Sequence, residues 1–412
     1  MRISIIIPTH NRSQSLKNTI ESIISLQDKF FFELIIVDNN SNDNTANIAR
    51  EYYPFVKYIF EKNTAFSRAR RAGANNASGD ILLFLDDDVL VNKGSFKSII
   101  EVFTNYPNCG VIAGRIDPQY SKKPPLWTLN CQKNFNGWSL YNSETYSFLK
   151  KNFQTVPSAA GPMMAVRKNV YDIVGGFPPD TVGVETNKGA KSFNKLYIGP
   201  GDYGLCLKIR KAGFKIYFSN NISVFHVIPA VRFTIQFWRS RIIGEGYCRA
   251  ISNRGFFHYS KFKIYLIRLL CEYYFLKFEQ KIYLKLKSNS NDAIIDGIDQ
   301  NELRLFYYKS YLDMDFVLRI HPDLWKLLWD IGDNGVSNRD FSKILEKLPQ
   351  EYKNLVSNEF INDVRPINSL RSYEKIIQNR GYYYKNQSIF FSSKIIRFIF
   401  IIIFRFKNFL NF

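Results

Sequence analysis

Residues 81–88 read ILLFLDDD, five apolar residues followed directly by three aspartates. A short, wholly apolar run that ends in polar residues is typical of a strand buried on both faces of a parallel sheet. Ligands of such sheets bind beyond the carboxyl ends of the strands, where these aspartates stand. The stretch therefore predicts a central strand with an acidic binding edge.

The flanking sequence alternates between strand and helix patterns with short connections. Strands are predicted at residues 3–7, 32–37, 56–60 and 110–113, and helices begin near residues 13, 46, 67 and 95. This alternation indicates an α/β fold with a mostly parallel sheet and helices on both faces. The first strand-to-helix turn lacks both glycine-rich phosphate-binding patterns, which argues against a dinucleotide oxidoreductase and a P-loop enzyme.

The sequence after residue 114 is less regular. Residues 115–160 are expected to be irregular and residues 180–200 to be a mobile loop, because the latter hold many Gly, Lys and Asn residues. A helix is predicted to begin at Asp202 and to end at Gly213. The predicted strands in this part are residues 161–166, 216–218 and 223–226.

The three aspartates are unfavourable neighbours on electrostatic grounds alone. If the backbone stays extended, Asp86 and Asp88 point to the same side, and each negative charge raises the pKa of the other carboxyl. A divalent cation resolves this conflict, because carboxylate oxygens suit Mg²⁺ or Mn²⁺ and substrate phosphates complete the shell. The alternative is a solvated acidic turn.

Two further side chains are candidates for chemistry. Asp202 stands at the start of a helix, where the dipole favours its ionised form, so it could take a proton from a hydroxyl. It could equally be a purely structural N-cap. His226 ends a strand and could bind a metal, although a lone histidine is more often structural.

The composition is strongly basic, with 56 Lys and Arg against 36 Asp and Glu and a net charge of +20. Nucleic acid, anionic lipid and phosphorylated substrates are partners for such a charge, and a general compositional bias is the alternative. The five scattered cysteines argue against a disulfide framework or a zinc site and fit a reducing cytosol. No apolar stretch reaches the roughly 20 residues of a membrane-spanning helix.

Six motifs follow one another along residues 1–245. They are SIIIPTHNR (4–12), LIIVDNNS (34–41), the block 63–88 with ASGD and FLDDD, MAVR (164–167) with GGF (175–177), GDYGLCLKIR (201–210) and VFH (224–226). In sequence and order they resemble the motifs of glycosyltransferase family 2, whose members have the nucleotide-binding GT-A fold. One departure is Gly201, because the family usually has glutamate before the aspartate that corresponds to Asp202.

The resemblance implies where a nucleotide-sugar binds. Pro8, Thr9 and Asp38 would hold the base, with Arg70 near the base or the diphosphate. Asp86 would lie near the ribose or the metal. The remaining members of the implied nucleotide-binding set are Arg12, Asn39 and Asp87.

The resemblance also implies the chemistry. A Mn²⁺ or Mg²⁺ ion would be held by Asp86, Asp88 and His226. Asp202 would be the general base that deprotonates an acceptor hydroxyl, and direct displacement at the anomeric carbon would invert its configuration. We expect a UDP-sugar as donor and a glycan or lipid-linked glycan as acceptor, as in cell-surface polysaccharide synthesis.

The expected domains are a GT-A catalytic domain (1–245, with nucleotide-binding half 1–114 and acceptor half 115–245) and a basic, aromatic, mainly helical accessory region (246–412). Residues 389–412 mix Lys and Arg with Phe and Ile, and could attach the protein to an anionic membrane surface. We therefore expect a cytoplasmic protein, peripheral on the inner face of the membrane. Oligomerisation remains possible.

Two other classes of protein stay open at this point. A nucleotidyltransferase acting on sugar phosphates also uses paired carboxylates and a metal, but residues 8–12 lack its usual glycine-rich basic loop. A basic nucleic-acid-binding protein would explain the net charge, but three carboxylates on its binding edge would repel phosphate. We therefore expect no nucleic acid as partner.

Overall fold

The computed structural model of the chain describes residues 1–26, 32–62, 65–178, 181–185, 195–198 and 201–234, with isolated positions between residues 237 and 311. Its strands are β1 (Ile3–Thr9), β2 (Phe32–Asp38), β3 (Val56–Phe60), β4 (Ile81–Leu85), β5 (Val89–Val91), β6 (Cys109–Tyr120), β7 (Phe153–Thr155), β8 (Met163–Arg167), β9 (Thr181–Glu185), β10 (Lys195–Ile198) and β11 (Lys215–Ile228). Its helices are α1 (Ser13–Ile24), α2 (Thr45–Glu51), α3 (Phe66–Asn75), α4 (Ser95–Asn105), α5 (Leu126–Phe135), α6 (Lys168–Ile173) and α7 (Gly201–Lys211), and a short 3₁₀ helix, η2 (Ala230–Phe233), follows β11.

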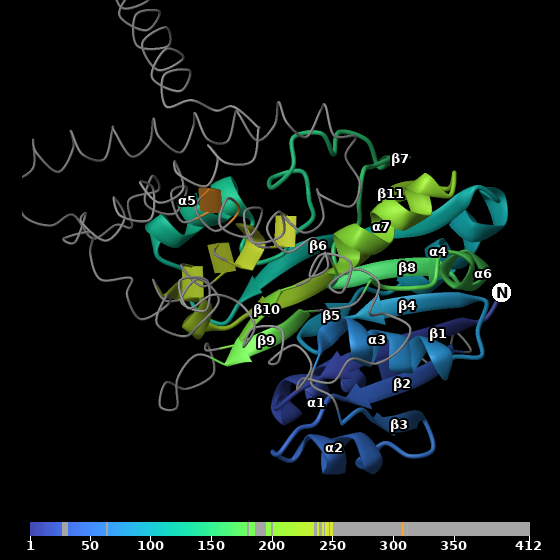
Figure 1. Ribbon diagram of the computed structural model, residues 1–412, viewed down its shortest axis with the longest axis horizontal. Coiled ribbons are helices and arrows are strands. Elements are labelled where there is room, and N and C mark those ends of the chain that lie inside the picture. Colours follow the sequence, from blue (N-terminus) through green and yellow to red (C-terminus); the bar gives the residue numbers. More distant parts are fainter. Residues whose placement is uncertain are drawn as a thin grey trace, which may run out of the picture.

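The first four strands form a parallel sheet in the order β3-β2-β1-β4 (Figure 1). Every residue of β1 and β4 is buried, as expected for apolar strands covered on both faces. The chain moves outward from β1 to β3 through α1 and α2, and returns across the sheet through α3. Because such crossovers are right-handed, α1 and α2 cover one face and α3 covers the other.

The sheet continues beyond β4 as β8-β6-β11-β5, with β7 also paired to β11. β8 runs antiparallel between β4 and β6, whereas β6 and β11 are parallel to each other. The short strands β5 and β7 pair antiparallel with different halves of β11. The α/β fold with a mostly parallel sheet is therefore confirmed.

Several details of the second half differ from the sequence prediction. The region 115–160 is not irregular throughout, because β6 runs on to Tyr120 and α5 follows. The predicted loop at 180–200 contains β9 and β10, which pair as an antiparallel hairpin. The two short strands predicted at 216–218 and 223–226 are one long strand, since β11 stays paired with β6 on both sides of an irregularity at 219–223.

A polar cluster holds the amino ends of the central strands. Ser4 Oγ donates to Glu33 Oε2 (2.6 Å), and the backbone N–H of Gly79 donates to Ser4 Oγ (2.9 Å). The backbone N–H of Ser78 reaches the same carboxylate oxygen at 2.9 Å. A Cβ atom at position 79 would lie 2.7 Å from the Arg2 carbonyl oxygen, so the close approach of this turn to β1 requires glycine.

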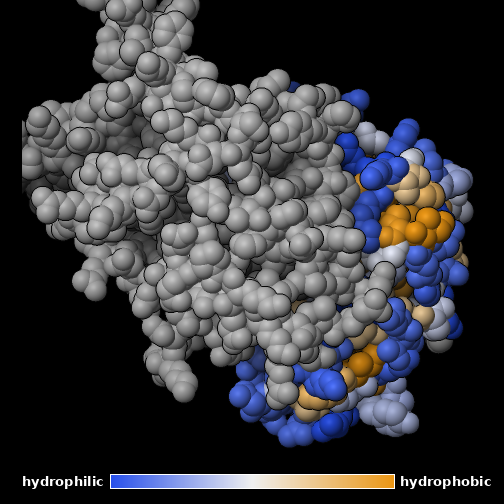
Figure 2. Space-filling model, viewed as in Figure 1, coloured by the Kyte–Doolittle hydropathy of each residue, from blue (hydrophilic) through white to orange (hydrophobic). Residues whose placement is uncertain are grey.

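The described surface that is visible in Figure 2 is mostly hydrophilic, with a few separate hydrophobic patches. Within the described residues, no helix is long and apolar enough to cross a bilayer. The region predicted to be a helical accessory, residues 246–412, lies almost wholly outside the described residues, and so does the basic aromatic tail 389–412.

Candidate active site

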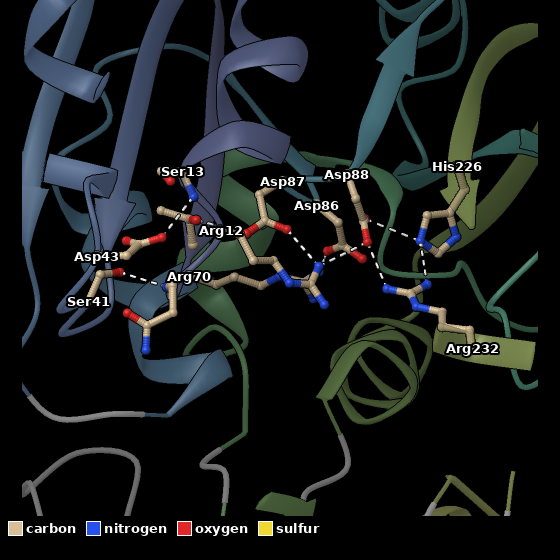
Figure 3. Close-up of polar contacts among 12 residues, drawn as sticks. Arg12, Ser13, Ser41, Asp43, Arg70, Asp86, Asp87, Asp88, His226 and Arg232 are labelled. Atoms are coloured by element: carbon tan, nitrogen blue, oxygen red, sulfur yellow. Dashed lines mark hydrogen bonds and ion pairs between the residues drawn. The ribbon is translucent and has the colours of Figure 1, made fainter. Parts of the chain in front are cut away.

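The three aspartates lie in a turn between β4 and β5, at the carboxyl edge of the parallel strands. The backbone is not extended here, contrary to the expectation, although the Asp88 charge does raise the pKa of Asp86 as the sequence predicted. Instead, each of the three carboxylates has its own set of partners (Figure 3). Asp87 and Asp88 share Arg12, Asp88 is also paired with Arg232, and Asp86 is paired with Arg70.

Asp87 is paired with the loop that follows β1. Thr9 Oγ1 donates to Asp87 Oδ2 at 2.7 Å, and Arg12 Nη1 donates to Asp87 Oδ1 at 2.9 Å. Burial raises the pKa of Asp87, and the Arg12 charge offsets only part of that effect. Asp87 in turn is the main cause of the raised pKa of Arg12. These contacts fix the β1–α1 loop against the acidic turn.

Asp88 is surrounded by basic side chains. Arg12 Nη1 donates to Asp88 Oδ2 at 2.9 Å, and Arg232 Nη2 donates to the same oxygen at 2.7 Å. His226 Nε2, from β11, lies 3.1 Å from Asp88 Oδ1. Burial alone would raise the pKa of Asp88, but His226, Arg232 and Arg12 outweigh it and hold that pKa below its ordinary value of 3.8. In Figure 3, Arg12 approaches Asp88 from the side of Asp87, and Arg232 approaches from the side of His226.

Asp86 points toward Arg70 of α3. Arg70 Nη2 donates to Asp86 Oδ1 at 2.9 Å, and Arg70 Nη1 pairs with Asp202 at the start of α7. The Arg70 side chain is fully buried, with its guanidinium carbon 4.0 Å from the ring centre of Phe66 and 5.3 Å from that of Phe177. Burial raises the pKa of Asp86 to about 6, although Arg70 acts in the opposite direction. One buried guanidinium thus joins a carboxylate of the acidic turn to the carboxylate of α7.

Gly161, two residues before β8, is fitted closely to this bridge. The carbonyl oxygen of Gly161 accepts from Arg70 Nη2 at 3.1 Å. A Cβ atom at position 161 would lie 2.4 Å from Asp202 Oδ2 and 2.8 Å from Arg70 Nη2. No side chain can stand at this position unless Asp202 or Arg70 moves.

The residues predicted to hold the nucleotide base lie beside this cluster at the ends of β1 and β2. Asp38 is buried, with Oδ1 accepting from the Ser41 N–H (2.9 Å) and Oδ2 accepting from the Tyr58 hydroxyl (2.8 Å). The N–H of Asn39 donates to the Thr9 carbonyl at 2.8 Å, which connects β2 to the cluster. Pro8 is buried in β1 opposite Val37. The partly exposed Tyr58 thus lies directly beside the buried Asp38.

The structure brings the predicted residues together at one edge of the sheet and adds partners that the sequence did not reveal. Arg232, Gly161 and Tyr58 were not predicted, because nothing in their local sequence distinguishes them. The expected metal ligands are only partly grouped: Asp88 and His226 are neighbours, whereas Asp86 pairs with Arg70. Among the described residues, no three His, Cys, Asp or Glu side chains form a group that could hold a metal ion.

Asp88 and His226 nevertheless fit a divalent ion. Asp88 Oδ1 is a buried carboxylate oxygen without a hydrogen-bond donor, and His226 Nε2 lies beside it. Two neighbouring ligands about 2.1 Å from an octahedral ion are roughly 3 Å apart, close to the 3.1 Å between these atoms. One carboxylate and one imidazole make a site that substrate phosphates and water could complete.

Comparison with known proteins identifies the class. Residues 4–174 match the family model described as Glycosyl transferase family 2. The matched segment contains β1 to β8, the acidic turn and Arg70. Residues 4–174 thus match glycosyltransferase family 2, and the family and GT-A fold that the motifs predicted are confirmed for this part of the chain. Of the classes that the sequence left open, it is a glycosyltransferase.

The similar proteins are distant relatives. A glucosyl-dolichyl phosphate glucuronosyltransferase of Haloferax volcanii is 19% identical over 265 residues, which are 61% of this chain and 78% of that protein. The O-antigen chain rhamnosyltransferase WbaN of Salmonella anatum is 26% identical over 54% of this chain and 65% of that protein. Among solved structures, the mannosyltransferase PcManGT of Pyrobaculum calidifontis, in complex with GDP-Man and Mn²⁺, is 14% identical with a TM-score of 0.43, covering 87% of this chain and 84% of that one. A TM-score this low carries no inference about the site.

Proposed function

We propose that this protein transfers a sugar from a nucleotide-sugar, with a UDP-sugar favoured, to a hydroxyl of a glycan or lipid-linked glycan, with inversion at the anomeric carbon. The donor would bind across the ends of β1, β2 and β4, and the acceptor would approach from the side of β8 and α7. The catalytic unit would be residues 1–245, with residues 246–412 as an accessory region.

The observation that carries this proposal is the Arg70 bridge. One buried guanidinium is paired with Asp86, which we assign to the donor side, and with Asp202, which we assign to the acceptor side. The Asp202 side chain is 26% exposed, so an acceptor hydroxyl can reach it. Arg70 orients the Asp202 carboxylate, which would accept the proton of the attacking hydroxyl.

The donor side would use the groups around the acidic turn. A Mn²⁺ or Mg²⁺ ion held by Asp88 and His226 would supply positive charge for the leaving diphosphate. The Arg12 side chain is 46% exposed, so phosphate oxygens could bind its guanidinium while it stays paired with Asp87. The base would bind at the edge of the sheet that is formed by Pro8, Thr9, Asp38 and Asn39.

The test is a panel of nucleotide-sugars, scored for slow donor hydrolysis with Mn²⁺ or Mg²⁺ and without an acceptor. Asp202→Asn should keep donor affinity and lose transfer on the order of 10²-fold or more, because the amide cannot act as a base. Asp172→Asn is the matched control, since Asp172 is exposed on α6 and pairs only with Lys168 among the ion pairs of the described residues. If Asp202→Asn transfers at the wild-type rate, another group is the base.

The protein would work on the inner face of the membrane, with residues 389–412 attaching it to anionic lipid. Each Lys or Arg near such a surface contributes about 1 kcal/mol, and phenylalanine burial adds to this. A chain that ends at residue 388 should stay active but no longer float with anionic liposomes. If it floats as well as the full chain, or aggregates, the tail has a different role.

A further inference from the structure

Arg232 stands where a divalent ion would bind. Its Nη2 donates to Asp88 Oδ2 at 2.7 Å and its Nη1 lies 3.0 Å from His226 Nε2, so one guanidinium contacts both candidate metal ligands. Arginine only donates hydrogen bonds, so His226 Nε2 is the accepting nitrogen in this contact. The lone pair that would bind a metal is therefore directed at Arg232.

The geometry around Asp88 supports the same conclusion. His226 Nε2 lies only 3.1 Å from Asp88 Oδ1, and that oxygen has no hydrogen-bond donor of its own. Arg232 is the cation that contacts both side chains, through the other Asp88 oxygen, Oδ2, and through His226 Nε2. Arg12 differs, because it contacts Asp88 and Asp87 but is not hydrogen-bonded to the histidine.

The charges of the site are nearly balanced without a metal. Four carboxylates (Asp86, Asp87, Asp88 and Asp202) meet three guanidinium groups (Arg12, Arg70 and Arg232). A divalent ion that entered alone would give this buried cluster an excess of positive charge. A diphosphate that entered with the metal would supply the missing negative charge and a new partner for an arginine.

We propose that Arg232 is a displaceable cation: it closes the position between Asp88 and His226 in the donor-free enzyme and moves to the diphosphate when metal and nucleotide bind together. This rests on the proposed function. Arg232 comes from the short η2 segment that follows Pro229, and its side chain is 13% exposed. The consequence is that metal alone binds weakly and that nucleotide strengthens metal binding.

The experiment measures Mn²⁺ dissociation constants of the full chain by electron paramagnetic resonance, without nucleotide and with UDP or GDP. In the wild type the nucleotide should tighten Mn²⁺ binding, and Mn²⁺ should tighten nucleotide binding by the same factor. In Arg232→Met, Mn²⁺ alone should bind on the order of 10-fold tighter or more, because a positive charge about 3 Å from the ligands is gone. The coupling between metal and nucleotide should shrink accordingly.

Two variants serve as controls. Arg232→Lys keeps the charge and should keep metal binding weak without nucleotide. Arg2→Met removes the same charge at the opposite edge of the sheet, where Arg2 donates to the Ser78 carbonyl, and should leave Mn²⁺ affinity unchanged. If Arg232→Met is less stable, added Mn²⁺ should raise its melting temperature more than that of the wild type.

The outcomes separate this inference from the proposed function. If the wild type binds Mn²⁺ and nucleotide cooperatively but Arg232→Met has unchanged or weaker affinity for Mn²⁺ alone, Arg232 is not the displaceable cation and the donor site stands. If the wild type binds neither UDP nor GDP with Mn²⁺, both proposals are overturned.

Discussion

Gly161→Ala should separate the placement of Asp202 from donor binding. The added methyl group would lie 2.4 Å from Asp202 Oδ2, and a Cβ contact below 3.0 Å is not tolerated, so the carboxylate must move by roughly 0.6 Å or more. Misplacement of a reacting group by about 1 Å can cost on the order of 10²-fold in rate. We therefore expect kcat to fall by about 10²-fold, which corresponds to about 2.7 kcal/mol of transition-state stabilisation.

The fold should tolerate this change. The backbone at position 161 is not in the left-handed region, and the atoms that must give way are the ends of side chains. The loss of glycine also restricts the unfolded chain, which favours folding by about 0.4–1 kcal/mol and offsets part of the strain. We expect the melting temperature to change by only a few degrees.

The assay is steady-state transfer with the best donor of the panel, together with calorimetry of nucleotide binding. Gly94→Ala is the matched control, because its methyl group would meet nothing within 4 Å, but its φ of +89° makes alanine strained. That variant should lose about 1 kcal/mol of stability and keep its kcat. A wild-type kcat in a folded Gly161→Ala protein would refute the role of Asp202, and a collapse of donor affinity would refute the separation of the two sides.

Three further changes should each lower the stability of the fold. Gly79→Ala should lower the free energy of unfolding by about 2 kcal/mol in denaturant titrations, because its methyl group would overlap backbone atoms of β1. Asp88→Asn should cost about 3 kcal/mol, measured in the same way, because the mostly buried Arg232 loses its negative partner. Glu33→Gln should cost about 1 kcal/mol at neutral pH. Burial raises the pKa of Glu33, but hydrogen bonds from Ser4 and Ser78 lower it below its ordinary 4.5. The wild type therefore has its full stability advantage over Glu33→Gln above pH 4.5 and loses that advantage as the pH falls through the lowered pKa. Melting curves of the wild type and Glu33→Gln should therefore converge in acid, and a constant difference would contradict this explanation.

The parallel half of the fold could be predicted because its signals are local. Runs such as residues 3–7 and 81–85 are apolar throughout and end in polar residues, and both are fully buried strands. β5 gave no such signal, since three residues after an acidic turn become a strand only by pairing with β11 far along the chain. α5 was missed because its sequence shows no clear apolar stripe and begins at Pro125 without a capping side chain.

The site shows the same division between local and distant information. The sequence placed the carboxylates at the correct edge, because that position follows from the end of a strand. It could not show their partners, because Arg70 and Arg232 are two among 56 Lys and Arg residues and lie 16 and 144 positions from the aspartates they contact. The turn at residues 86–88 also depends on these distant charges, which draw neighbouring carboxylates in different directions.

These arginines connect the stability of the fold to the affinity of the site for a metal ion. A buried carboxylate needs a positive partner, and Arg12, Arg70 and Arg232 each supply one from a different part of the chain. The same contacts compete with any ion that approaches the aspartates. Removal of an arginine that contacts a metal ligand should therefore weaken the donor-free fold and strengthen metal binding at the same time. Loss of Arg70 should weaken the fold without that gain, because Arg70 is bonded to Asp86 and Asp202 and not to the Asp88–His226 pair. The charges around the acidic turn are thus balanced for a metal ion that enters together with the negatively charged diphosphate of the donor.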